Sequence, residues 1–146
     1  MKFRFLIVGL CVAAGFSAAV FAADDVIAQR KALMKANGAA AKIAVDMING
    51  ATPFDPAAAA EAARKIAHDL ETFPTLFPEG SDQGETTASP AIWTNMDGFK
   101  AKADQTIADA NAAADAAAQG LDAFKTAFSV VGGDCGSCHQ AFRIKK

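Results

Sequence analysis

The amino-acid sequence predicts an all-α protein, an antiparallel up-down-up-down four-helix bundle. Alanine, the best helix former, is abundant along most of the chain. No segment of useful length alternates β-branched and polar residues as a half-buried strand would. The first and second helical stretches are joined by a short connection, as are the third and fourth. Short connections favour antiparallel neighbours and therefore predict the bundle.

Residues 1–22 have the pattern of a cleaved signal peptide. Two basic residues come first, an apolar stretch follows, and small residues end the segment at Ala22. We expect cleavage after Ala22, or as a second choice after Ala23, which leaves one domain over residues 23–146. The apolar stretch is a little short for a membrane span. An uncleaved N-terminal anchor is the alternative, and we expect no stable anchor.

The mature chain is acidic. The full sequence has 14 basic and 16 acidic residues, and the signal peptide would remove two of the basic ones. An acidic surface argues against binding to nucleic acid, whose phosphates require a basic face. Export indicates an oxidising compartment, and we expect the protein to be located in the periplasm.

The first helix is expected from about Asp24 to Asn49, with Gly50 ending it. Helical spacing predicts an inner face formed by Val26, Ile27, Leu33, Met34, Ala41, Val45 and Ile48. Met47 lies off this face. The second helix is expected to begin at Asp55 and Pro56, an N-cap acid followed by proline at the first helical position. Its inner stripe is Ala59, Ala63, Ile66, Leu70 and Phe73, and Pro74 and Pro78 stop it.

A polar loop over residues 78–90 precedes the third helix, which is expected to begin within Ser89–Asn95 and to end at Gln119. Gly120 is its expected C-cap. The fourth helix runs from Leu121 to about Arg143. Its inner side is predicted to comprise Phe124, Phe128, Val131, Cys135, Cys138 and Phe142.

The predicted core is under-filled. The third helix has no large apolar side chain between Ala108 and Ala118, and the second helix is also rich in alanine. Alanine buries little area, and burial stabilises by only about 25 cal/mol per Å². A large apolar cofactor between the helices would supply the missing volume.

Residues 135–139, Cys-Gly-Ser-Cys-His, have the spacing of covalent c-type haem attachment. Cys135 and Cys138 lie three residues apart on a helical turn, so each can add to one vinyl group of a haem. His139 can then bind the iron as the proximal ligand. Thioether bonds also retain the cofactor in an exported protein. The sequence therefore predicts a bundle that encloses one covalently bound haem c.

Other interpretations of these cysteines are less consistent with the sequence. A redox-active CxxC normally lies near a helix N-terminus in a chain with βαβ patterns, and this chain has neither feature. A simple disulfide is a second alternative and a zinc site a third. Zinc takes four nitrogen or sulfur ligands, and beyond the motif the mature chain has only a distant histidine, His68, which we expect at the surface.

The chain resembles the class II cytochromes c, the family of cytochrome c′ and its low-spin relatives. The resemblance covers essentially the whole mature chain. The haem motif is specific for attachment, and the remaining segments are together specific for the family. The matching segments are Arg30–Met34, Pro53–Asp55, Pro90–Trp93, and Cys135–His139 with Phe142 and Arg143. Glycines at 132, 133 and 136 depart from a regular helix and indicate either close approach to the ring or local irregularity.

The resemblance implies a role for Met34, and the chemistry of their side chains suggests roles for Arg30 and Trp93. Met34 stands where low-spin relatives place a methionine ligand to the iron, and where many five-coordinate relatives have a nonligand. It either ligates the iron as the distal ligand or only packs nearby, and ligation is our expectation. Met47 and Met96 are less suited. We expect Arg30 to bind a haem propionate, the alternative being a solvated side chain, and Trp93 to pack against the ring edge or close the bundle end.

We therefore expect a periplasmic low-spin monohaem cytochrome c that carries single electrons between periplasmic redox partner proteins. No substrate pocket or acid–base pair is evident, so we do not expect an enzyme. The main alternative is a five-coordinate, high-spin cytochrome c′ that binds NO or CO at a vacant distal site. A non-haem helical interaction protein is a weaker one. The resemblance permits a monomer or a homodimer through the first two helices.

Overall fold

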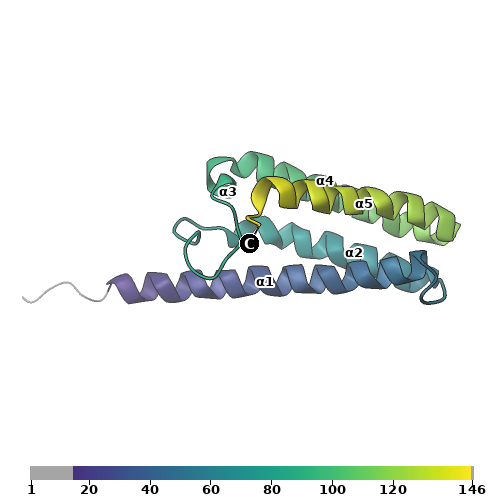
Figure 1. Ribbon diagram of the computed structural model, residues 1–146, viewed down its shortest axis with the longest axis horizontal. Coiled ribbons are helices and arrows are strands. Elements are labelled where there is room, and N and C mark those ends of the chain that lie inside the picture. The colour runs from purple at the N-terminus through teal and green to yellow at the C-terminus, as the bar shows by residue number, and fades with distance from the viewer. Residues whose placement is uncertain (1–14, 146) are drawn as a thin grey trace, which may run out of the picture.

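A computed structural model describes residues 15–145, with side chains from residue 25 onward. Four long helices run antiparallel to their neighbours in sequence, and the chain doubles back at each end of the molecule (Figure 1). The elements are α1 (Gly15–Ile48), α2 (Pro56–Thr72), a 3₁₀ turn (Phe73–Leu76), α3 (Ala91–Thr94), α4 (Met96–Ala116), a second 3₁₀ turn (Ala117–Gln119) and α5 (Leu121–Phe142). The predicted all-α bundle is confirmed.

The structure differs from the prediction at the start of two helices. α1 begins at Gly15, inside the segment assigned to the signal peptide, rather than near Asp24. The predicted third helix is divided into α3 and α4 at Asn95, whose backbone leaves the helical region (φ −142°, ψ 55°). The Asn95 side chain accepts a hydrogen bond from the Gly98 amide at 3.1 Å. This local bond competes with a continuous helix and restarts it as an N-cap.

The predicted start of α2 is confirmed. The Asp55 carboxylate accepts hydrogen bonds from the amides of Ala57 and Ala58, at 2.8 and 3.1 Å, and Pro56 occupies the first turn. These bonds satisfy amides that have no partner inside the helix. Gly120 separates the second 3₁₀ turn from α5 with φ of 107°, a conformation that glycine adopts without strain.

The inner face of α1 was predicted incorrectly at two positions. Val45 is 41% exposed, whereas Met47 is only 3% exposed and its sulfur accepts a hydrogen bond from the Asp55 amide at 3.4 Å. α2 packs along Ala40, Ala44 and Met47, which are four and three residues apart. The face of α1 that is buried depends on where α2 lies, and hydrophobicity alone did not locate it.

Two clusters of buried residues form the interior. The larger lies between α1, α2, α4 and α5 and consists mostly of alanine, with Met47, Ile66, Phe124, Phe128 and Val131 as its large members. The smaller is aromatic and closes the end of the bundle where α3 lies. Its residues are Phe77, Ile92, Phe99 and Phe142, with Phe73 and Trp93 packed against them. The alanine-rich centre agrees with the under-filled core expected from the sequence.

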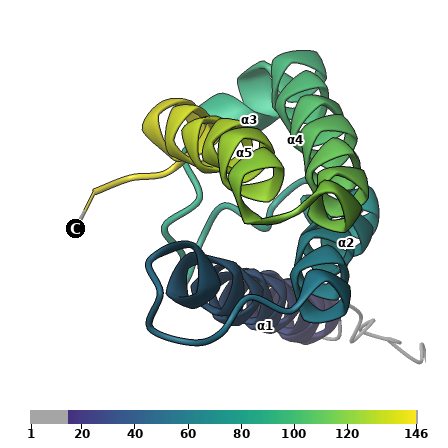
Figure 2. The same cartoon turned by 90° about the vertical axis from the view of Figure 1, so that its right-hand side faces the viewer.

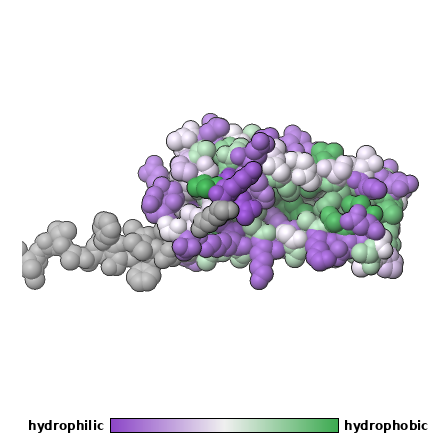
Figure 3. Space-filling view, in the orientation of Figure 1, coloured by the Kyte–Doolittle hydropathy of each residue, from purple (hydrophilic) through white to green (hydrophobic). Residues whose placement is uncertain are grey.

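The bundle is open on one side. α1 packs on α2, α2 on α4 and α4 on α5, whereas α1 and α5 touch at only a few points. Viewed along the bundle, the four helices form an incomplete ring with its gap between α1 and α5 (Figure 2). On the face shown in Figure 3, hydrophobic residues gather between these two helices and hydrophilic residues surround them. We call this region the α1–α5 side.

The N-cap of α2 gives a direct test of the fold. In the haem-bound protein, Asp55→Ala should lower the free energy of unfolding by about 1 kcal/mol, because two helix amides lose their acceptor. Asp55→Asn retains an acceptor oxygen and should stay within a few tenths of a kcal/mol of the wild type. Urea unfolding followed by circular dichroism measures both. Equal losses in the two variants would show that the carboxylate charge, not the cap, is what stabilises α2.

Candidate haem-attachment site

The predicted attachment residues lie together in the last turns of α5. Cys135, Cys138 and His139 are three and one residues apart, which places them on neighbouring positions of one side of the helix. Both cysteines are half-buried. Cys135 packs against the alanine-rich cluster and Cys138 against the aromatic cluster. The two sulfurs therefore stand at the boundary between the two parts of the interior.

The electrostatics of the motif favour neutral side chains. Burial raises the pKa of the Cys135 thiol, and the neighbouring Asp134 carboxylate raises it further. Burial also raises the pKa of the Cys138 thiol. Desolvation, with a contribution from Arg143, lowers the pKa of His139. A redox-active CxxC requires a cysteine whose pKa is lowered, so these thiols have the opposite bias. A neutral imidazole has the lone pair that iron needs.

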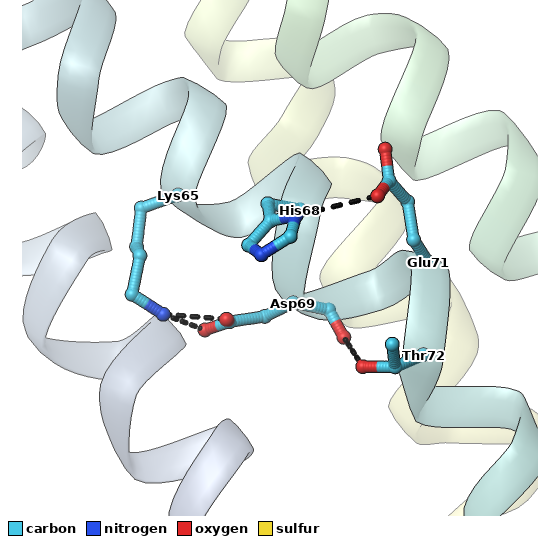
Figure 4. A network of polar contacts seen from close by, with 5 residues as sticks. All are labelled: Lys65, His68, Asp69, Glu71 and Thr72. Atoms are coloured by element: carbon cyan, nitrogen blue, oxygen red, sulfur yellow. Dashed lines mark hydrogen bonds and ion pairs between the residues drawn. The ribbon is translucent and has the colours of Figure 1, made fainter.

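The structure gives no support to a zinc site. Among the residues described, no group of three or more histidine, cysteine, aspartate or glutamate side chains could hold a metal ion. His68 is exposed on α2 and contacts Glu71 at 3.3 Å, beside the ion pair between Lys65 and Asp69 (Figure 4). The prediction of a surface histidine at position 68 is confirmed.

One side of α5 has room for a flat ring. Gly132, Gly136 and His139 follow one another at intervals of four and three residues and so share a stripe of the helix. A Cβ atom on either glycine would meet no neighbouring atom within 4 Å. α5 continues unbroken through both glycines, so the local irregularity considered above is not observed. A pocket of about 590 Å³ lies beside Gly136 and His139 and extends to Arg143 and Thr87.

These observations fit a haem. The bundle is open beside α1 and α5, the glycine stripe leaves the backbone uncovered, and neutral cysteine and histidine side chains would supply the chemistry of attachment and ligation. Cys135 and Cys138 would hold the vinyl-derived side of the ring, and His139 would hold the iron.

Met34 is distinguished from the other described methionines by its packing. Met47 is part of the alanine-rich cluster and Met96 packs against the aromatic one. Met34 is half-buried on α1 but packs against neither cluster. Its thioether is therefore not used as a filler of either protein core.

Arg30 is buried rather than solvated. Its side chain is 5% exposed, and its guanidinium donates hydrogen bonds to the Leu76 carbonyl at 2.6 Å and to the Ser81 carbonyl at 2.9 Å. A further bond joins it to the Ser81 hydroxyl. The guanidinium also lies over the Phe77 ring, 4.1 Å from its centroid. The solvated alternative is wrong, and binding to a propionate stays a prediction.

Trp93 lies at the aromatic end of the bundle. Its indole Nε1–H donates to the Pro78 carbonyl at 3.0 Å, and its ring meets the Phe77 ring edge-on at 5.7 Å between centroids. This placement agrees with closure of the bundle end, while packing against a haem edge stays a prediction.

Sequence reasoning missed two features of the site. Arg30 binds the backbone carbonyls of Leu76 and Ser81, which leave no trace in residue identity, and the Ser81 hydroxyl, whose distance of 51 residues along the chain hid the pairing. Asp109 of α4 and Asp134 of α5 meet across the helix seam beside Cys135. These two acids come together only because of how α4 and α5 pack against each other. The sequence did show that an acidic residue precedes the first cysteine.

The fold and site define a class: a four-helix bundle with a CxxCH haem-binding motif on its last helix. The sequence model described as Cytochrome C' matches residues 25–143. The chain is 40% identical to cytochrome c-556 of Agrobacterium fabrum, over 93% of this chain and 90% of that protein. It is 41% identical to cytochrome c' of Rhodopseudomonas palustris, over 100% of this chain and 99% of that protein.

The solved structure of cytochrome c' from Rhodopseudomonas palustris superposes with a TM-score of 0.79 at 38% identity, covering 84% of this chain and 98% of that one. An NMR-validated structural model of oxidised cytochrome c556 from the same organism superposes with a TM-score of 0.75 at 26% identity, covering 84% of this chain and 98% of that one. The chain belongs to the cytochrome c' family. It accordingly binds one covalent haem c and takes part in electron transport.

Attachment through both cysteines can be tested chemically. The haem of the wild-type protein should resist acid–acetone extraction, because two thioether bonds hold it. Cys138→Ala leaves one such bond and should weaken the attachment, whereas Ser137→Ala, between the cysteines, should leave it intact. Pyridine haemochrome spectra of the extracted and residual haem measure the outcome. Clean extraction from the wild type would overturn the assignment of Cys135 and Cys138.

The open bundle predicts a poorly packed apoprotein. Chain produced without haem attachment should be largely disordered or molten, because the cofactor stabilises only the folded state that encloses it. Near-ultraviolet circular dichroism and side-chain NMR signals measure this, with the haem-bound protein as the control. Sharp, dispersed signals from the apoprotein would show that the α1–α5 side closes without haem.

Proposed function

We propose that this chain is a low-spin, one-electron carrier whose haem iron is held between His139 of α5 and Met34 of α1. Cys135 and Cys138 form the thioether bonds. The observation that carries this proposal is the packing of Met34. It is half-buried on α1 yet belongs to neither core cluster, so its sulfur remains available to a ligand.

The two proposed ligands come from the helices that flank the open side. Haem, when bound, supplies one-electron exchange between ferric and ferrous iron. Met34 and His139 would hold the iron in both oxidation states, so little rearrangement of the protein would accompany electron transfer. Methionine favours the ferrous ion and raises the reduction potential. Arg30, already fixed by the 76–81 loop, keeps further N–H groups for a propionate, and Trp93 limits access from the aromatic end.

The cellular setting follows from the first segment of the chain. Residues 1–22, which lie largely outside the described residues, act as a signal peptide, and residues 23–146 remain as the periplasmic protein. None of the described helices is long and apolar enough to cross a membrane. Its partners are other periplasmic redox proteins, and a homodimer agrees with a family in which dimers are frequent. It catalyses no reaction of its own.

The second candidate function is that of a five-coordinate, high-spin protein that binds NO or CO at a vacant distal site. One observation favours it: a relative named cytochrome c' shares 41% identity over the full chain. In that case Met34 packs near the iron without binding it. The two functions therefore differ in the role of one side chain.

Substitution of Met34 separates the two candidates. The wild type should have a low-spin ferric spectrum and bind CO poorly at neutral pH, because CO reaches the ferrous iron only in the small fraction of molecules whose methionine has dissociated. Met34→Ala should become high-spin, bind CO readily and have a lower reduction potential. The fold should survive, since His139 and both thioethers remain. Ferric absorption spectra, CO titration and spectroelectrochemistry provide the measurements.

Met96→Leu is the matched control, because it changes a half-buried methionine of similar volume that packs in the aromatic cluster. It should leave the spin state and the affinity for CO unchanged. If the wild type is already high-spin, and Met34→Ala alters neither property, then Met34 is a packing residue and gas binding replaces electron transfer as the function.

A further inference from the structure

The seam between α4 and α5 contains a polar strip beside the attachment motif. On α4, Lys102, Gln105 and Asp109 follow one another at three and four residues, and Lys102 donates to the Ser137 hydroxyl at 3.1 Å. The Gln105 amide donates to Asp109 Oδ2 at 2.6 Å. On α5 the strip is formed by Asp134 and Ser137, whose hydroxyl donates to the Asp134 carbonyl at 3.0 Å.

The carboxyl group of Asp134 has no conventional partner. Its Oδ2 atom is buried and receives no hydrogen bond from any N–H or hydroxyl group of the described chain. The carboxyl group that lies against it belongs to Asp109. Ionised carboxylates are acceptors only, so two of them in contact cannot satisfy one another. A hydrogen bond between Asp109 and Asp134 requires one proton.

The surrounding charges favour retention of that proton. Burial raises the pKa of Asp134, and the hydrogen bond and the charge of Asp109 raise it further. Lys102 lowers the pKa of Asp134, and its effect is the smallest of these. On its own helix, Asp134 acts electrostatically on the adjacent Cys135 thiol, which thioether formation would convert to an uncharged sulfide. Two close carboxylates titrate as one coupled pair whose second ionisation is displaced upward.

We propose that Asp109 and Asp134 share one proton and exchange it with solvent as the haem iron changes oxidation state. The inference rests on attachment of the haem at Cys135, the residue that follows Asp134, and not on the identity of the distal ligand. An electron supplied by a one-electron donor removes a positive charge from the cofactor. The doubly ionised pair, stabilised by that charge, then becomes less favourable and takes up a proton from solvent. On oxidation the electron passes to an acceptor and the pair releases its proton to solvent.

This coupling is reciprocal. If reduction favours the protonated pair, protonation must favour reduction by the same factor. The reduction potential should therefore fall with rising pH between the pKa of the pair in the oxidised protein and its higher pKa in the reduced protein. It should be flat on either side of this range. A single proton limits the slope to about 59 mV per tenfold change in proton concentration.

The experiment measures the reduction potential of the haem-bound protein against pH in the wild type, in Asp109→Asn and in Asp104→Asn. Asp109→Asn keeps an acceptor for Gln105 and offers a permanent N–H to Asp134, so it imitates the protonated pair. It should abolish the slope. Asp104, exposed on the same helix, is the matched control, and its variant should retain the slope. Proton uptake on reduction, followed with an indicator dye in weakly buffered solution, should be lost in Asp109→Asn alone.

A wild-type potential that is independent of pH would overturn the proposal, and so would a slope that persists unchanged in Asp109→Asn. Asp134→Asn provides a second variant if Asp109→Asn does not fold, and the same loss of slope is expected from it. Ferric absorption spectra recorded for every variant report the axial ligands separately. Failure of methionine ligation and failure of proton coupling are thereby distinguishable.

Discussion

The absence of close packing between α1 and α5 is the constraint on which the rest of this structure depends. Alanine allows α2 to approach α1 and α4 closely, and the three seams around the bundle are well packed. The same small side chains cannot bridge the fourth side. The chain therefore has a folded architecture whose interior is incomplete without a large apolar group. The residues proposed to hold such a group lie on the two helices that border the opening.

Both ends of that opening are fixed by specific contacts. At one end, Arg30 ties α1 to the 76–81 loop through three hydrogen bonds and a cation–π contact with Phe77. At the other, Met47 receives the amide of the α2 N-cap residue. Between these anchors α1 carries Met34, which is half-buried and packs against neither core cluster. The position of the Met34 side chain is therefore set by contacts made away from it.

Features that neighbouring residues determine were predicted from the sequence, whereas features that depend on packing between distant segments were not. The start of α2 and the boundary at Gly120 were predicted because one or two adjacent residues determine each of them. The haem motif was equally local. The break at Asn95 was missed because an asparagine permits a cap, such as the one that its side chain forms with the Gly98 amide, but does not require it. Other features depend on how segments distant in the sequence pack together, which no single segment encodes. These are the burial of Met47 in place of Val45, the partners of Arg30, and the contact between Asp109 and Asp134.

The position of Cys135 and Cys138 at the end of the last helix has a consequence for the order of biogenesis. If the chain is exported from its N-terminus, as proposed above, α1, α2 and α4 reach the new compartment before the residues proposed to attach the haem. Three helices with an alanine-rich interior would then exist as an incompletely folded intermediate, which proteases could cleave and which could aggregate. Covalent attachment would then be the last step of maturation. A chain truncated only a dozen or so residues early would lose the ability to mature, although it retained nearly all of its helical sequence.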